Sequence, residues 1–537
     1  MNTASTASTG TVREALRGGA YPYRAYLPQS VKIYPLHQLL PTQEAPLIGA
    51  WDPVWRPDTR AYLDSYGTST RVGRQLYLHI PFCPAFCHFC CLYKTTRRDE
   101  QSSDFIERFV QCLLREIAAY GRMHTATLRP VTSIYFGGGT PSVLTGGQVE
   151  RLITAIRAHL PVVDVPEITF EGMAHQLRSD TYLAALVENG VNRISYGVQT
   201  FQPELRKQLG RLDTVEDIRA ARDAVRGRHE IRDLNFELMI GIPSQTLADV
   251  IADLDETIAE APESTDVLFY NAVPGTRYYN LIRSGARAPQ PVGPELLMMR
   301  QEVVQRLTAG GYHHATGEIF DRRVGHLDDF NGTHYGGFTG LDEMLALGPS
   351  SYGFLNGTVY QNVASVSDYM RLMSENRLPI RAWQSIDART ARRRSLLFGL
   401  QFGVIRGQAL SLATLPLLTR WWHRGLIART GLDWVLTDAG RMWYNMMQLE
   451  CIPLREASAA LDLTFDAREQ ERLLFHPEVQ VGNIELAREL ERVIEGGSPA
   501  WRGLRRGVFR ALDRTRQKRA LTFLGPDAMG ELELAEP

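Results

Sequence analysis

Short apolar, β-branched runs alternate with longer segments of helical spacing through the middle of the chain. The strand-like runs lie at 76–80, 133–137, 167–173, 193–199, 234–241 and 266–273. Between them, apolar residues recur every three or four positions at 104–121, 147–159, 180–188, 215–226 and 247–260. Such an alternation predicts parallel βα units. We therefore expect an α/β protein with an open, partial (β/α)6 barrel, whose site lies at the carboxyl ends of the strands.

The pattern changes after residue 273. Segment 295–309 has helical spacing, and the Gly-rich stretch 334–363 predicts loops and a hairpin. The stretch up to 450 predicts a small helical domain with a strand pair and a last helix, which resembles a winged helix. The expected domains are an extension, a barrel with its completing loops, a C-terminal domain and a helical tail, at 1–75, 76–380, 381–452 and 453–537. The extension is either an arm over the barrel mouth or a plain surface wrap.

Composition narrows the classes of partner. The chain has 537 residues, too many for one ordinary domain, and 59 basic side chains nearly balance 60 acidic ones. This balance gives no reason to expect nucleic acid or an anionic membrane as the main partner. No apolar run approaches the ~20 residues that span a bilayer, and the first residues lack the apolar core of a secretory signal. The expected location is the cytoplasm.

Four of the six cysteines, Cys83, Cys87, Cys90 and Cys91, lie together directly after the first strand. A secreted disulfide framework would spread them out. Structural zinc, the main alternative, usually takes four ligands in two separated pairs. Three thiolates leave one iron of a four-iron cluster open, and that iron can chelate S-adenosylmethionine (SAM). The spacing therefore predicts a [4Fe–4S] cluster on Cys83, Cys87 and Cys90. Cys91 is poorly placed to reach the same metal.

A Gly-rich turn follows the second strand. Gly137, Gly138 and Gly139, with Thr140, would let the backbone approach a ligand and leave its polar groups free. An ordinary turn has the same composition. One βα unit after the cysteine loop, the turn fits contact with the amino group of a cluster-bound SAM.

Several motifs occur in order: YLHIPFC with its following cysteines, FGGGTP, EITFEG, NRISYGVQTF, LGR and NFELMIGIPSQT. Together they resemble the radical SAM family of the oxygen-independent coproporphyrinogen III oxidase (HemN-like), over roughly residues 70–450. The resemblance implies a radical SAM barrel and a C-terminal domain. This branch includes porphyrinogen oxidases, heme chaperones, heme-degrading methylases, and methylases or cyclopropanases of natural-product pathways.

The resemblance also implies roles for individual residues. Contacts to the cluster-bound SAM are expected from Tyr77, Phe89, Gly137, Gly138, Gly139, Thr140, Glu171 and Arg211. A second SAM is expected at Gln199, Glu237 and Met239. Glu237 stands where the family usually has Asp. Gln199 and Cys91 are, with the three cluster cysteines, candidate catalytic residues. Tyr77 and Met239 could instead be plain core, and Arg211 could simply pair with a carboxylate.

One departure bears on the reaction. The oxidase has a further cysteine two residues beyond the last cluster ligand, where this chain has Leu92 and an early Cys91. We therefore favour an enzyme that makes a 5′-deoxyadenosyl radical for methylene transfer from a second SAM, by C-methylation or cyclopropanation of an sp² carbon. Porphyrinogen decarboxylation, heme degradation and heme chaperoning are the alternatives. Expected partners are an aromatic, heteroaromatic or tetrapyrrole substrate and a reductant such as flavodoxin or ferredoxin.

Overall fold

The computed structural model describes residues 39–65, 73–84, 86–270, 276–288, 290–291, 293–326, 341–411 and 414–451. Six strands at its centre are β2 (Arg74–Ile80), β3 (Val131–Gly138), β4 (Val162–Gly172), β5 (Arg193–Gln199), β6 (Asp233–Ile240) and β7 (Ser264–Phe269). They pair in chain order and all in parallel. The predicted α/β class and the parallel βα units are confirmed.

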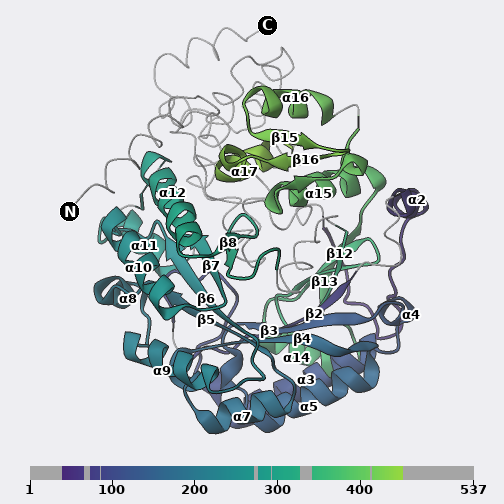
Figure 1. The fold of residues 1–537 in the computed structure, drawn as a ribbon. Coiled ribbons are helices and arrows are strands. Elements are labelled where there is room, and N and C mark those ends of the chain that lie inside the picture. Colours follow the sequence, from purple (N-terminus) through teal and green to yellow (C-terminus); the bar gives the residue numbers. More distant parts are fainter. Residues whose placement is uncertain are drawn as a thin grey trace, which may run out of the picture.

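A helix crosses between each pair of neighbouring strands. The main ones are α3 (Ser103–Tyr120), α5 (Gly146–His159), α7 (Asp180–Glu188), α9 (Val215–Arg226) and α10 (Leu247–Glu260). Figure 1 shows α3, α5, α7 and α9 along one side of the sheet. Reciprocal capping boxes at Thr145, Thr214 and Thr246 fix where α5, α9 and α10 begin. Shorter helices are α4 (His124–Thr127), α6 (Ala174–Leu177), α8 (Pro203–Leu209) and α11 (Arg277–Arg283).

The sheet extends beyond the six predicted strands at both edges. Strand β10 (Glu343–Leu347) lies parallel to β2, and an antiparallel series follows: β11 (Tyr352–Leu355), β12 (Thr358–Asn362), β13 (Ile380–Ser385) and β1 (Leu40–Pro41). The other edge carries β9 (Ile319–Asp321) and β8 (His313–His314) beside β7. Helices α12 (Gly293–Ala309) and α14 (Val366–Ser374) complete this part of the chain.

The predicted hairpin in the Gly-rich stretch is confirmed between β11 and β12. Asn356 and Gly357 both have positive φ, at 45° and 73°. A two-residue turn of this kind matches the twist of the paired strands. The part of the stretch before residue 341 lies outside the described residues.

The C-terminal part forms a separate small sheet. Its elements are α15 (Ala388–Gln401), β14 (Val404–Ile405), α16 (Leu415–His423), β15 (Ile427–Thr430), β16 (Asp433–Leu436) and α17 (Asp438–Glu450). The predicted strand pair is β15 with β16, and β14 joins as a third strand. The large sheet runs through Ser385, past the boundary expected after residue 380. The predicted tail at 453–537 lies outside the described residues.

The described part of the N-terminal extension lies against the antiparallel end of the sheet. Strand β1 pairs with β13, and the Thr59 hydroxyl of α2 (Pro57–Ser65) donates to the Ile386 carbonyl at 2.8 Å. This segment thus adds a strand to the sheet and buries Trp51, Tyr62 and Leu63. Residues 1–38 and 66–72, to which the expectation of an arm over the barrel also applies, lie outside the described residues. A search of the described helices finds none with the length and apolar character needed to cross a membrane.

Candidate active site

The cysteine loop leaves the carboxyl end of β2 and is held by backbone hydrogen bonds. The Cys83 N–H donates to the Thr95 carbonyl at 3.1 Å, and the His88 N–H donates to the Leu209 carbonyl at the end of α8 at 2.9 Å. Cys83 is buried, whereas Cys87 and Cys90 are half-buried, and the three form no disulfide. The loop therefore presents three thiols from a fixed backbone.

The spacing of these thiols tests which metal group they fit. They are near enough for Cys87 and Cys90 to act on the ionisation of Cys83. Yet within the described part of the chain, they form no group of ligand atoms that all lie within 4.8 Å of one another. At least two of the three sulfurs therefore lie more than 4.8 Å apart. A single tetrahedral zinc ion would need thiolates about 3.8 Å apart. The wider spacing suits a cluster, in which each thiolate binds a different iron.

Thr140 and the glycine turn close one side of the loop. The Thr140 hydroxyl lies 3.3 Å from the Cys83 sulfur. A Cβ on Gly139 would lie 2.7 Å from the carbonyl oxygens of Ile80 and Phe82, so only glycine fits there. Burial raises the pKa of the Cys83 thiol to about 11, and the Thr140 contact opposes this shift. The turn is thus packed directly on the cysteine loop.

Arg211 reaches the loop from the segment after α8. Its Nη1 lies 3.7 Å from the Cys87 sulfur, and its Nη2 donates to the Gly197 carbonyl at 2.7 Å and to the Asp213 carboxylate at 2.8 Å. The Nε atom is buried and has no hydrogen-bond partner among the described residues. Arg211 therefore does pair with a carboxylate, and it also keeps a donor for a ligand.

Two carboxylates face each other inside the barrel. The Glu171 carboxylate of β4 accepts from the Tyr135 hydroxyl at 2.5 Å and from the Gly138 N–H at 3.2 Å. Glu237 of β6 accepts from the Ser195 hydroxyl at 2.9 Å. Burial, and then the charge of Glu237, raise the pKa of Glu171 to about 8; burial also raises the pKa of Glu237. A cationic ligand group would restore the charged form of Glu171.

Tyr77 and His79 lie beside this pair on β2. The Tyr77 hydroxyl lies 3.1 Å from His79 Nδ1, and His79 Nε2 lies 3.0 Å from the Tyr93 carbonyl. Burial lowers the pKa of His79 to about 4, so the imidazole is neutral. Burial, and then the nearby Glu171, raise the pKa of Tyr77 well above its usual value. Tyr77 is therefore a neutral hydroxyl next to Glu171.

The residues expected around a second SAM differ in their surroundings. Gln199 ends β5 with a φ of 65°, and its buried Oε1 has no hydrogen-bond partner among the described residues. Met239 packs in an apolar cluster that includes Leu209 and Tyr270, and Phe89 lies against the same cluster. Gln199 thus has an open acceptor, whereas the core interpretation of Met239 is compatible with its packing.

Cys91 and Leu92 continue the loop past the last expected ligand. Cys91 is half-buried, and Leu92 is 53% exposed. Lys94 Nζ donates to the Cys90 carbonyl at 2.9 Å. The position of the oxidase's extra cysteine therefore carries an exposed apolar side chain.

Sequence reasoning missed two polar residues behind Arg211. Asp213 accepts from Arg211, and its second oxygen lies 2.6 Å from His175 Nδ1. Asp213 follows the LGR motif by two residues, and His175 follows Glu171 by four. Nothing in their spacing along the chain relates the two, because they meet only through the packing of α6 and α9.

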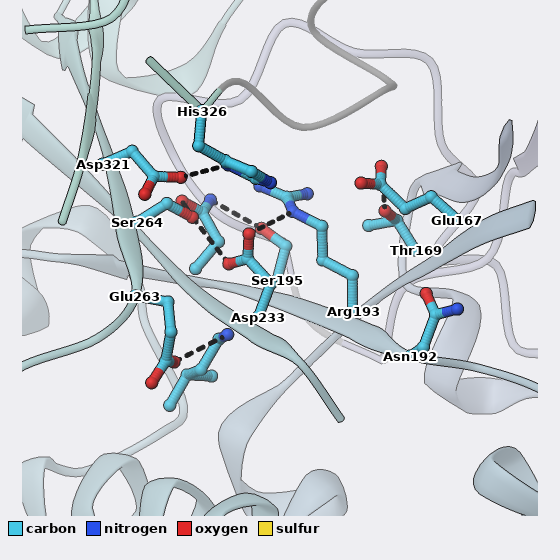
Figure 2. Close-up of polar contacts among 12 residues, drawn as sticks. Glu167, Thr169, Asn192, Arg193, Ser195, Asp233, Glu263, Ser264, Asp321 and His326 are labelled. Carbon is cyan, nitrogen blue, oxygen red and sulfur yellow. Dashed lines mark hydrogen bonds and ion pairs between the residues drawn. The ribbon is translucent and has the colours of Figure 1, made fainter. Parts of the chain in front are cut away.

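A second polar network lies at the opposite, amino-terminal ends of β5 to β7 (Figure 2). Ligand atoms of Asp233, Asp321 and His326 lie within 4.8 Å of one another. However, Arg323 Nη2 already lies 2.5 Å from Asp233 and 2.7 Å from Asp321. Burial acts to raise the pKa of Asp233, but Arg193 and Arg323 outweigh it, and the pKa is lowered. The arginines neutralise these carboxylates, so the network closes the barrel base without needing a cation.

Comparisons with known proteins agree with this geometry. A family model described as the Radical SAM superfamily matches residues 77–257. The oxygen-independent coproporphyrinogen III oxidase of Pseudomonas aeruginosa is 31% identical over 317 residues, which cover 57% of this chain and 67% of the relative. The heme chaperone HemW of Bacillus subtilis is 27% identical over 382 residues, covering 69% of this chain and 97% of the relative.

A solved structure shows the same fold. Coproporphyrinogen III oxidase (HemN) from Escherichia coli, described as a radical SAM enzyme, superposes with a TM-score of 0.60 at 23% identity. The match covers 75% of this chain and 93% of the other. It therefore extends well beyond the cysteine loop and the strands around it.

Proposed function

Because this chain belongs to the radical SAM family that includes the oxygen-independent coproporphyrinogen III oxidase and the heme chaperone HemW, we propose that it cleaves SAM at a cluster on Cys83, Cys87 and Cys90 and acts on a tetrapyrrole. The family uses a [4Fe–4S] cluster and SAM. The observation that carries the proposal is the convergence of Thr140 and Arg211 on sulfurs of the cysteine loop. Both contacts come from elements far away in the sequence.

The residues of the chain divide the work as follows. Cys83, Cys87 and Cys90 would hold the cluster, which when bound and reduced would supply the electron for the cleavage of SAM. Gly138 packs against His79 and Gly139 against Ile80 and Phe82, which would hold the glycine turn beside the amino acid part of SAM. The Glu171 carboxyl, neutral near pH 7, would lose its proton when the SAM ammonium group binds beside it, because the two charges compensate each other. Arg211 would orient the ligand from the side of Cys87.

The buried walls of the site support radical chemistry. Tyr77, Tyr135 and Glu171 are held by hydrogen bonds within the barrel, so none of them needs bulk water. Fixed polar groups in a site that excludes water position a reactive species without quenching it. The same enclosure suits a substrate whose reacting carbon is brought to the strand ends.

The choice of a tetrapyrrole follows the relatives. The names of the oxidase and of the heme chaperone both refer to tetrapyrroles. Under this proposal, SAM and a reductant such as flavodoxin or ferredoxin would be the other small-molecule and protein partners. Anaerobic incubation with SAM, dithionite and coproporphyrinogen III or heme tests it. We expect 5′-deoxyadenosine formation to rise with the tetrapyrrole present; a rate that neither tetrapyrrole changes would contradict the substrate class.

The expectation that methylene transfer is the main reaction is not supported by the names of the relatives, and we keep it as a second candidate. Two observations favour it: the exposed Leu92 replaces the oxidase's extra cysteine, and the Gln199 carbonyl lacks a partner among the described residues. Under this candidate a second SAM would bind near Gln199.

SAM with a deuterated methyl group separates the two reactions. Methylene transfer passes deuterium into 5′-deoxyadenosine, because the hydrogen comes from the second SAM, and it releases S-adenosylhomocysteine. Decarboxylation of a propionate leaves 5′-deoxyadenosine unlabelled and releases carbon dioxide. Gln199→Ala should suppress the deuterium transfer more than the basal cleavage of SAM.

A further inference from the structure

A chain of three side chains connects the protein surface to one of the proposed cluster ligands. His175 Nδ1 lies 2.6 Å from Asp213 Oδ1, Asp213 Oδ2 accepts from Arg211 Nη2 at 2.8 Å, and Arg211 Nη1 lies 3.7 Å from the Cys87 sulfur. The Asp213 side chain is 1% exposed and that of His175 is 35% exposed.

Hydrogen bonds hold both the backbone carbonyl and the carboxylate of Asp213. Its backbone carbonyl accepts from Arg206 Nη2 at 2.6 Å, and Arg206 Nη1 also donates to the Val198 carbonyl at 2.6 Å. The carboxylate therefore sits on a backbone that is tied to the end of β5. Since both of its oxygens are engaged, one by Arg211 and one by His175, it has one well-defined orientation.

Arg211 depends on this anchor for its own orientation. A free arginine side chain has many rotamers, so it needs fixed partners to hold one orientation. Here the Gly197 carbonyl and Asp213 both bind Nη2, which leaves Nη1 directed at the Cys87 sulfur. A cationic donor on a cluster thiolate stabilises the more negative, reduced cluster, and such hydrogen bonds tune cluster potentials.

We propose that Asp213 and His175 are positioning residues that hold Arg211 against the Cys87 sulfur and thereby raise the reduction potential of the cluster and favour SAM binding. The inference rests on the proposed function, since it needs a cluster on Cys87. Arg211 touches the reacting groups, whereas Asp213 and His175 act through it.

The surroundings of His175 argue against a purely local role. The imidazole faces Asp213 and Asp217, and Asp217 is also bound by Arg178 at 2.9 Å. His175 thus gives its hydrogen bond to the buried carboxylate behind Arg211. Helix α6, which carries His175, follows Glu171 on β4, so the contact also ties the Glu171 side of the site to the Arg211 side.

Two quantities test the inference in the full-length holoenzyme. One is the midpoint potential of the cluster, measured by EPR during a redox titration, and the other is the Kd of SAM. His175→Phe removes the hydrogen bond and keeps a ring. We expect the potential to fall and the Kd of SAM to rise about tenfold, as for other outer-shell changes. His229→Phe, the same substitution at a histidine whose side chain is 92% exposed, is the matched control and should alter neither quantity.

Two further variants make the result decisive. His175→Gln keeps a donor for Asp213 and should restore the potential. In an Arg211→Gln background, His175→Phe should lower the potential no further, because its effect passes through Arg211. If His175→Phe fails to hold iron, the comparison of His175→Gln with His175→Ala replaces it.

An unchanged potential in a cluster-loaded His175→Phe or His175→Ala protein would overturn the inference. So would a His175→Phe substitution that lowers the potential as much in the Arg211→Gln background as in wild type. Failure of the proposed function is distinguishable, because it would show as a wild-type protein that holds no cluster.

Discussion

The space around Gly139 limits which residues the site can accept at this position. Gly139 has backbone carbonyls on both sides of the position that a Cβ would take, whereas Gly147, near the start of α5, has nothing within 4 Å of that position. The two glycines belong to neighbouring segments of the same βα unit. They therefore form a matched pair for substitution.

We expect Gly139→Ala to destabilise the protein by about 1–3 kcal/mol and to lower its iron content, because the turn must move away from Ile80 and Phe82. Gly147→Ala should leave iron content unchanged and stability equal or slightly higher. Thermal unfolding and iron analysis of the anaerobically purified variants measure both. Equal behaviour of the two variants would show that the turn is not packed on the cysteine loop.

The Glu171 carboxyl predicts a dependence of stability on pH. Its folded pKa of about 8 lies above the usual 4.5, so between these values the folded protein holds a proton that the unfolded chain has released. The stabilisation is complete below the unfolded pKa and is lost as the pH rises through the folded one. Wild type should lose about 3 kcal/mol from this group between about pH 6 and about pH 9.

Glu171→Gln removes this titration while keeping the shape of the side chain. Its thermal midpoint should therefore fall less than that of wild type over the same pH range, in protein without SAM. Identical pH profiles of the two proteins would mean that Glu171 is already ionised. Saturating SAM should make the profiles converge if its ammonium group binds at Glu171.

Much of the site could be predicted at this scale. The thiol spacing and the glycine turn indicated a cluster and its neighbour because both signals are local in sequence. Asp213 and His175 could not be predicted, because an Asp or His acquires meaning only through the partner that packing supplies. Arg211 was expected to contact a ligand or to pair with a carboxylate, and its contacts allow both.

At the scale of elements, helix α3 is joined to the added strands by one buried acid. Glu116 accepts from the Gly348 N–H at 2.9 Å, from Asn362 Nδ2 at 3.1 Å and from the Tyr369 hydroxyl at 2.7 Å. All of these groups are donors. Glu107, on the same helix, forms its contacts with Gln148 and Arg151 near the surface.

Glu116→Gln should destabilise the protein by about 1–3 kcal/mol, because an amide group would face donors in a buried site. Glu107→Gln should cost at most about 1 kcal/mol, as expected for a surface pair. Denaturant or thermal unfolding of both variants measures the difference. If the two costs are equal, the Glu116 contacts do not hold α3 to β10 and α14.

Element prediction succeeded where periodicity was long and failed where pairing was distant. The strands and helices of the βα units have strong apolar repeats and local caps, so most of their ends were placed within two residues. Strand β4 begins at Val162, five residues before the predicted start at 167. Strand β10 is five residues long and joins β2 through Arg74 and Glu343, an ion pair with N–O at 2.6 Å between positions 269 residues apart. No local sequence pattern predicts such a distant partner. Two-residue strands such as β14 are too short to show an alternation of apolar and polar residues.

At the scale of the whole molecule, the sheet separates two polar regions. The carboxyl ends of the strands bring together the cysteine loop, the glycine turn and Arg211, whereas the amino ends carry the neutralised network of Asp233, Asp321 and Arg323. Parallel strands place ligand sites at their carboxyl ends. We therefore expect chemistry in the first region, whereas the carboxylates of the second are already paired with Arg323.

Iron content and SAM cleavage of cysteine variants, measured anaerobically with dithionite, test this account most directly. We predict about four irons per wild-type chain and formation of 5′-deoxyadenosine. Replacement of Cys83, Cys87 and Cys90 with Ala should remove both, whereas Cys91→Ala should retain the iron. An intact cluster in the triple variant, or loss of iron in Cys91→Ala alone, would contradict the account.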